Sequence, residues 1–174
     1  MKMIMMVLGL MGFAAIAQAQ MGYEILKDSV TGEKMLEGPI HKKDIAGDPQ
    51  FTWYAESRAI YPEPNAEAVK ALKENKDSIY FIIFGGTWCE DTHFVLPKFY
   101  KIQEAAGFPE DRIALFAVTR DKKIQNPLVE SLNVHNVPTI IVMKDGKELG
   151  RVVEYGKTGY WDKELAEVIE KGAK

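Results

Sequence analysis

The stretch from Tyr80 to Thr92 constrains the fold of this chain more than any other part of the sequence. Residues 79–84 are all apolar or aromatic, which is typical of a central strand covered on both faces. Gly85 and Gly86 end this run, and apolar side chains then recur at helical spacing from Val95 to Ala106. The pattern therefore predicts a strand, a sharp loop and a helix in immediate succession.

Cys89, the only cysteine of the chain, falls at the start of that helix. Unpaired backbone N–H groups and the positive end of the helix dipole favour an anion there, and the thiolate is the reactive form of cysteine. Glu90 and Asp91 act in the opposite direction because like charges repel, and the sequence leaves this balance open. The alternative is a buried and inert thiol. The neighbouring Trp88, the glycines and the two acids disfavour it.

The N-terminus is typical of an export signal. Lys2 precedes an apolar stretch from Met3 to Ala17, and residues 17–19 (Ala-Gln-Ala) fit the small-x-small cleavage pattern. We therefore expect an exported protein, periplasmic or secreted, without stable membrane insertion after cleavage; an uncleaved N-terminal anchor is the alternative. A single cysteine in an exported protein indicates a reactive or intermolecularly paired thiol.

Length and composition predict one globular domain with an extension. The 174 residues are enough for a substantial core, and 47% hydrophobic with 27% charged residues exclude a disordered or collagen-like chain. The formal charge of −3 provides no basic surface, which argues against nucleic acid as a partner. The predicted division is a signal peptide (1–19), an N-terminal extension (20–63) and a main domain (64–174).

The predicted elements alternate between helices and strands from residue 64 onward. Upstream, the sequence predicts a short hairpin and a short helix that ends before Pro62. The later elements are a helix from residue 65, strand 79–84, the helix after Cys89, strand 113–118, a short helix 127–132, a hairpin turning at Asp145-Gly146, and helix 160–171 with Gly172 beyond its end. This order predicts parallel pairing by right-handed crossovers plus an antiparallel edge hairpin, in a three-layer α/β fold.

Four features in this order resemble thioredoxin-like proteins. They are Trp88-Cys89 after the first apolar strand, Pro97 in the following helix, Val137-Pro138-Thr139 as a cis-proline segment, and the Lys144-Asp145-Gly146 turn whose return strand leads to Gly156. The resemblance covers residues 64–174. It implies an α/β/α fold with a central mixed sheet and a C-terminal antiparallel hairpin plus helix.

The resemblance also implies a function in thiol–disulfide chemistry. It makes Cys89 the nucleophile and Trp88, Val137, Pro138 and Thr139 the residues that bind substrate. The expected partners are protein or small-molecule thiols and disulfides and an external thiol reductant.

The chain departs from the family pattern at two positions. The family's dithiol motif is Cys-x-x-Cys, but Thr92 stands here at the position of the resolving cysteine. Ile83 stands where many thioredoxins bury an aspartate. Thr92 cannot release a substrate, so the expected activity is that of a monothiol oxidoreductase or isomerase whose mixed disulfide at Cys89 is resolved by an external thiol.

Some interpretations stay open at this level. Thr92 either donates a hydrogen bond to the thiolate or satisfies backbone groups in the first helical turn. His93 is predicted to be a solvated surface residue; a metal site with Cys89 is the alternative, but two ligands fall short of the four of a structural zinc, so no cofactor is expected. The competing function is a redox-inactive module that holds extended polypeptide along the Val137–Pro138 edge.

Overall fold

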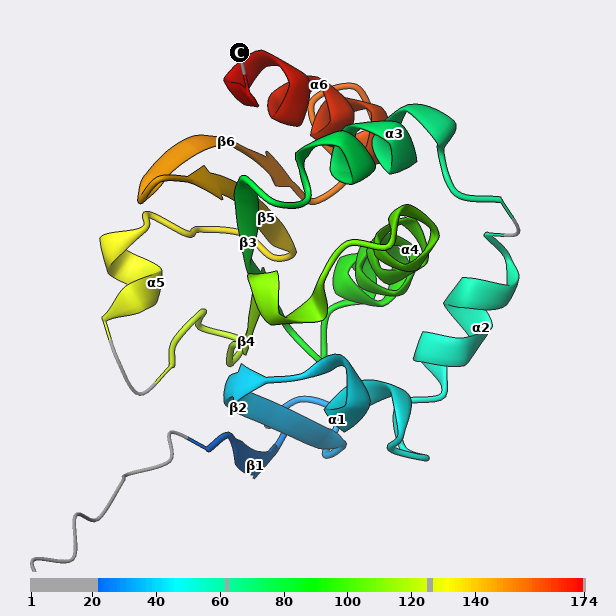
Figure 1. The fold of residues 1–174 in the computed structure, drawn as a ribbon. Helices are drawn as coiled ribbons and strands as arrows, with labels where there is room; N and C mark the ends of the chain where they lie inside the picture. Colours follow the sequence, from blue (N-terminus) through cyan, green and yellow to red (C-terminus); the bar gives the residue numbers. More distant parts are fainter. Residues whose placement is uncertain (1–21, 62, 125–126, 174) are drawn as a thin grey trace, which may run out of the picture.

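The computed structural model describes residues 22–61, 63–124 and 127–173 (Figure 1). The predicted signal peptide lies outside these residues. The described strands form a mixed sheet of six in the order β1-β2-β4-β3-β5-β6. Their bounds are β1 Glu24–Lys27, β2 Lys34–Ile40, β3 Ile79–Gly85, β4 Ile113–Ala117, β5 Thr139–Lys144 and β6 Lys147–Val153.

The helices from residue 66 onward follow the predicted alternation, whereas the short helix at residues 42–46 was not predicted. The helices are α1 Lys42–Ala46, α2 Trp53–Ala59, α3 Ala66–Asn75, α4 Glu90–Ala106, α5 Leu128–Ser131 and α6 Trp161–Ala173, with a 3₁₀ turn at Glu110–Arg112. α6 runs through Gly172, although the sequence placed this glycine beyond the helix end. A Cβ atom on Gly172 would lie 2.6 Å from the Cβ of Leu149, so the glycine is needed for close packing of α6 on β6.

The centre of the sheet is β3, which runs parallel to β4 and antiparallel to β5. β5 and β6 form the predicted antiparallel hairpin. At its turn Asp145 and Gly146 have φ values of 50° and 76°, the positive values that a tight two-residue hairpin turn requires.

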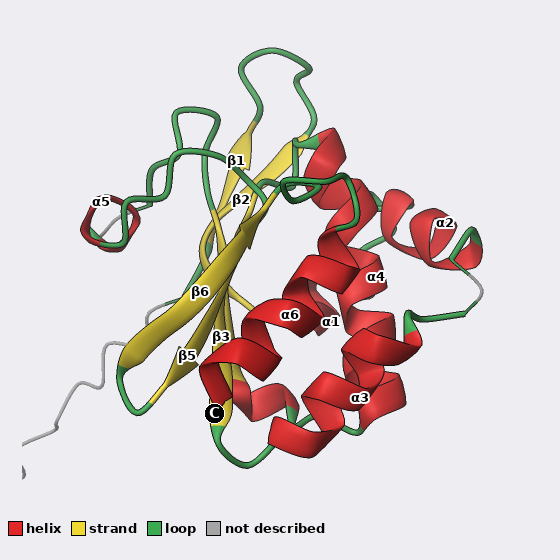
Figure 2. Cartoon of the chain, turned by 90° about the horizontal axis from the view of Figure 1, so that it is seen from above, coloured by secondary structure: helices red, strands yellow, loops and turns green. Residues whose placement is uncertain are grey.

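The sheet separates two apolar cores. Figure 2 shows α1, α2, α3, α4 and α6 on one face and the short α5 with loops on the other. Because side chains alternate along a strand, Phe81 and Ile83 of β3 enter the core under the helices, while Phe84 enters the core beside α5. This mixed sheet between helical layers is the α/β fold that the resemblance implied.

Residues upstream of the predicted main domain belong to the same sheet. β1 and β2 form the predicted hairpin, and β2 pairs antiparallel with β4 from Gly38 to Ile40. Phe51 and Tyr54 around α2 are buried in the helix-side core. The domain boundary at residue 64 itself stays a prediction.

Candidate active site

The loop between β3 and α4 carries Cys89 to the edge of the sheet. Cys89 is the N-cap residue of α4, with an extended backbone, and its carbonyl accepts a hydrogen bond from the His93 N–H at 3.0 Å. The Cys89 N–H in turn donates to the Gly86 carbonyl at 3.0 Å. A Cβ atom on Gly86 would lie 2.6 Å from the Trp88 ring, so glycine at this position allows Trp88 to fold back over the loop.

The thiol of Cys89 faces the segment before β5. Its Sγ donates to the carbonyl oxygen of Val137 at 3.2 Å, and the Val137–Pro138 peptide bond is cis. Cys89 is half-buried, whereas Val137 and Pro138 are buried. The Glu154 N–H donates to the Pro138 carbonyl at 2.7 Å, which ties this segment to the end of β6.

Thr139 does not offer its hydroxyl to the thiol site. The residue is buried, and its Oγ1 donates to the Asn136 carbonyl at 2.7 Å within the loop before β5. Among the sequence-predicted site residues, the structure thus brings Trp88, Cys89, Val137 and Pro138 together and uses the hydroxyl of Thr139 to hold the loop.

Trp88 is fixed from two sides. Its indole Nε1 donates to the Val118 carbonyl at 2.8 Å, and the guanidinium of Arg120 lies 4.8 Å from its ring centre, a cation–π distance. Arg120 donates two hydrogen bonds, at 2.7 and 2.6 Å, to the carboxylate of Asp28, which is only 3% exposed. These bonds lower the pKa of Asp28 and raise the pKa of Arg120.

Thr92 lies in the first turn of α4 and is 1% exposed. Its Oγ1 accepts a hydrogen bond from the Gly86 N–H at 3.1 Å. A buried backbone N–H without a partner is costly, so this hydroxyl stabilises the loop that carries Cys89. The geometry favours the second of its two predicted roles, the satisfaction of a backbone group.

The prediction that His93 is a solvated surface residue is wrong. Its ring stacks on Trp53 with the ring centres 4.1 Å apart and an interplanar angle of 13°. Its Nε2 lies 2.8 Å from the Thr87 carbonyl, to which it donates. Burial under Trp53 lowers the pKa of His93. The sequence missed this because α2, which supplies Trp53, reaches α4 only in the folded chain.

Acidic and aromatic residues form the rim next to the sulfur. Glu90 is exposed, and Asp91 lies beside the hydroxyl of Tyr155. The pKa of Tyr155 is raised to about 12, mainly by burial and to a smaller extent by the Asp91 carboxylate. The rings of Phe94 and Tyr155 meet at 5.3 Å in an edge-to-face arrangement.

Sequence reasoning missed Arg120, Asp28 and Tyr155. A signal existed for Arg120, because it follows the parallel strand β4 and the carboxyl ends of parallel strands β3 and β4 meet at one edge of the sheet. No local pattern marks Asp28 or Tyr155, whose positions depend on the N-terminal hairpin and on the end of β6.

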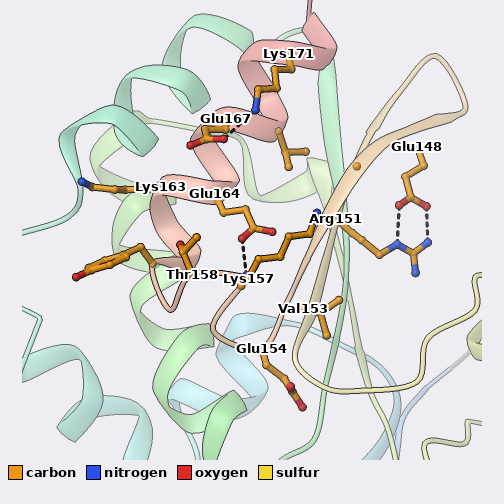
Figure 3. Close-up of a pocket in the computed structure, with 14 residues that line it drawn as sticks. Glu148, Arg151, Val153, Glu154, Lys157, Thr158, Lys163, Glu164, Glu167 and Lys171 are labelled. Carbon is orange, nitrogen blue, oxygen red and sulfur yellow. Dashed lines mark hydrogen bonds and ion pairs between the residues drawn. The ribbon is translucent and has the colours of Figure 1, made fainter.

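A separate charged groove lies between β6 and α6 (Figure 3). This β6–α6 groove has a volume of about 740 Å³, and Cys89 does not line it. Several of its charged side chains have near partners: Glu148 pairs with Arg151, Glu167 pairs with Lys171 at 2.9 Å, and the Glu164 carboxylate accepts the backbone N–H of Lys157 at 2.7 Å.

Residues 22–61, 63–124 and 127–173 contain neither a metal-binding cluster nor a membrane-spanning helix. No group of three or more histidine, cysteine or acidic side chains is placed to hold a metal ion within these ranges. No helix in the same ranges has the length and apolar character needed to cross a membrane.

A mixed sheet with a helix-capping cysteine opposite a cis-proline defines a protein of the thioredoxin-fold class. No protein-family model matches the chain. A thioredoxin of Staphylococcus saprophyticus is 32% identical over 110 residues, which cover 59% of this chain and 95% of that protein. A thioredoxin of Listeria monocytogenes is 27% identical over 99 residues, covering 57% of this chain and 87% of the relative. The chain therefore belongs to the thioredoxin-like family.

Structural comparison agrees on the fold. A Pseudomonas aeruginosa protein of unknown function superposes with a TM-score of 0.55 at 18% identity, over 78% of this chain and 94% of the other. At this identity the likeness concerns the fold alone. The family gives this chain the scaffold of a thiol–disulfide oxidoreductase.

Proposed function

We propose that this chain is an exported thiol–disulfide oxidoreductase that acts through Cys89 alone. The apolar N-terminus with its Ala17-Gln18-Ala19 site supports export. The observation that carries the chemistry is the contact of 3.2 Å between the Cys89 sulfur and the Val137 carbonyl, next to the cis-proline. Cys89 is half-buried, and we propose that an extended substrate pairs with the backbone of the segment beside it.

The proposed reaction has two exchange steps. The Cys89 thiolate attacks one sulfur of a substrate disulfide, forms a mixed disulfide and releases the second substrate sulfur as a thiolate. An external thiolate, or another cysteine of the substrate, then attacks the substrate sulfur of the mixed disulfide and releases the Cys89 thiolate. Each step breaks one S–S bond and forms another, so the number of disulfides is unchanged.

The protein lacks its own resolving group. Cys89 is the only cysteine, and the Thr92 hydroxyl accepts the Gly86 N–H. The mixed disulfide therefore persists until an external thiol or another cysteine of the substrate attacks it. This property distinguishes a monothiol mechanism from the dithiol cycle.

The direct test is to trap the intermediate. The chain without residues 1–19 is mixed with hydroxyethyl disulfide, and intact mass is followed with and without added glutathione. We expect one adduct at Cys89 that persists without glutathione and disappears with it, and no adduct in Cys89→Ser. Absence of any adduct, together with unchanged polypeptide binding in Cys89→Ser, would contradict the proposal and support the redox-inactive binding module.

A second variant tests the role assigned to position 92. Thr92→Cys restores the dithiol spacing of the family, so we expect the adduct to resolve without glutathione and leave an internal disulfide. Thr92→Ser is the matched control, since it keeps the hydroxyl and should retain the stable adduct. If Thr92→Ser also resolved its adduct, a group other than the residue at position 92 would be responsible.

A further inference from the structure

A cleft of about 350 Å³ lies between α2 and the first turns of α4, the helix whose N-cap residue is Cys89. We call it the α2–α4 cleft. One wall contains Glu56 of α2 and Ile60, the residue that follows α2. The other wall contains Glu90 and Phe94 from the start of α4. Glu90, which directly follows Cys89 in the sequence, is one of the residues that line the cleft. Its α2 wall lies outside residues 64–174, where the resemblance to thioredoxins is found.

The cleft belongs to a continuous apolar surface. Ile60 is 72% exposed, Phe94 39% and Tyr155 37%. Ile60 and Phe94 line the same cleft, and Phe94 contacts the ring of Tyr155. The Lys98 ammonium lies 2.7 Å from the centre of the Phe94 ring and holds it, while Lys98 itself is buried. Contiguous exposed apolar side chains of this kind mark interaction surfaces.

The charged side chains that line the cleft itself are acidic, and the ammonium of the buried Lys98 is a basic group next to the Phe94 ring. The charged residues that line the cleft are Glu56 and Glu90, and Asp91 lies beside Tyr155. Among the salt bridges of the described residues, none involves these three acids. His93 also lines the cleft, and burial of its ring, which stacks on Trp53, lowers its pKa.

We infer that the α2–α4 cleft binds the part of a substrate polypeptide that flanks its disulfide cysteine. It selects a bulky apolar side chain followed by lysine or arginine. Ile60 and Phe94 would contact the apolar side chain, and the carboxylates of Glu56 and Glu90, which form no salt bridge within the described residues, would attract the basic one. Phe94 lies five residues beyond Cys89, or about 7.5 Å along the helix axis, a span that two to three extended residues cover. This inference rests on the proposed function, since it names the substrate class of the same site.

The test compares peptides that differ only in the flanking residues. Each peptide carries one cysteine capped with 2-mercaptoethanol, so the leaving thiol is identical, and Leu-Lys, Leu-Glu or Ser-Lys follows two residues later. The rate constant for formation of the peptide–Cys89 mixed disulfide is divided by that for hydroxyethyl disulfide, which is small and neutral. We expect the Leu-Lys peptide to react about tenfold faster than the Leu-Glu peptide at low salt, with a smaller difference at high salt.

Two variants locate the effect in the cleft. The double variant Glu56→Gln plus Glu90→Gln should abolish most of the preference for lysine over glutamate. Phe94→Ser should reduce the preference for leucine over serine. The matched control is Glu148→Gln plus Glu167→Gln, which makes the same charge change in the β6–α6 groove and should leave both preferences intact.

The possible failures are distinguishable. If hydroxyethyl disulfide reacts with Cys89 but the three peptides react alike, the inference about the cleft is overturned while the proposed function stands. If the preference exists but survives the cleft variants, the cleft is not its source and the inference is again overturned. If no probe forms an adduct, the proposed function itself fails.

Discussion

The thiol site and the β6–α6 groove contrast in how their polar groups are satisfied. In the groove, Glu148 pairs with Arg151 and Glu167 with Lys171, partners that are three and four residues apart. At the thiol site the contacts join distant segments: Cys89 with Val137, Trp88 with Val118, and Arg120 with Asp28. The groove has about twice the volume of the α2–α4 cleft, yet two local ion pairs already neutralise four of its charged side chains. Volume alone is therefore a poor guide to function in this molecule.

Asp28→Asn should have the largest effect on stability among the changes that test this contrast. The buried carboxylate joins the N-terminal hairpin to Arg120 and so to Trp88, and removal of one partner leaves the other charge uncompensated. Because the folded-state pKa of Asp28 lies below its unfolded value near 4, the pair stabilises the protein above that pH. This stabilisation should be lost progressively as the pH falls from about 5.

Urea unfolding at pH 7 and pH 3 measures this effect. The variant should be clearly less stable than the wild type at pH 7, and the difference should shrink at pH 3. A difference that is the same at both pH values would show that the carboxylate charge is not what stabilises the hairpin contact.

Thr92→Val should have an intermediate effect. The substitution keeps the shape of the side chain but removes the acceptor of the Gly86 N–H, and an unsatisfied buried donor costs about 1–3 kcal/mol. We expect this loss in the free energy of unfolding, together with faster hydrogen exchange of the Gly86 amide. Thr92→Ser retains the acceptor, so its Gly86 amide should stay protected; equal exchange in both variants would contradict the assigned bond.

Glu148→Gln should have the smallest effect. It weakens a surface ion pair, and such pairs contribute less than about 1 kcal/mol. Arg151 also keeps its hydrogen bond to the Leu132 carbonyl at 2.8 Å. Thermal unfolding should therefore be almost unchanged. A loss as large as that of Thr92→Val would mean that the groove is organised by more than local pairs.

Much of the scaffold was predictable because it follows from local patterns. The apolar run of residues 79–84 predicted the central strand, Asp145-Gly146 predicted the hairpin turn, and the helical spacing after Cys89 predicted α4. The surroundings of the cysteine were less predictable. The sequence predicts His93 in solvent, because nothing near it in the chain indicates that Trp53 stacks on its ring.

The sequence by itself determined that this chain has one sulfur, that a helix starts there, and that no second cysteine can resolve a mixed disulfide. These properties depend on residue identity and on periodicity over a few turns. Only the tertiary structure decided that Thr92 bonds to Gly86, that Asp28 holds Arg120 over Trp88, and that α2 lines a cleft against the first turns of α4. Such contacts form between segments that are far apart in the chain and meet around the sheet. Short-range sequence patterns do not indicate which distant segments meet.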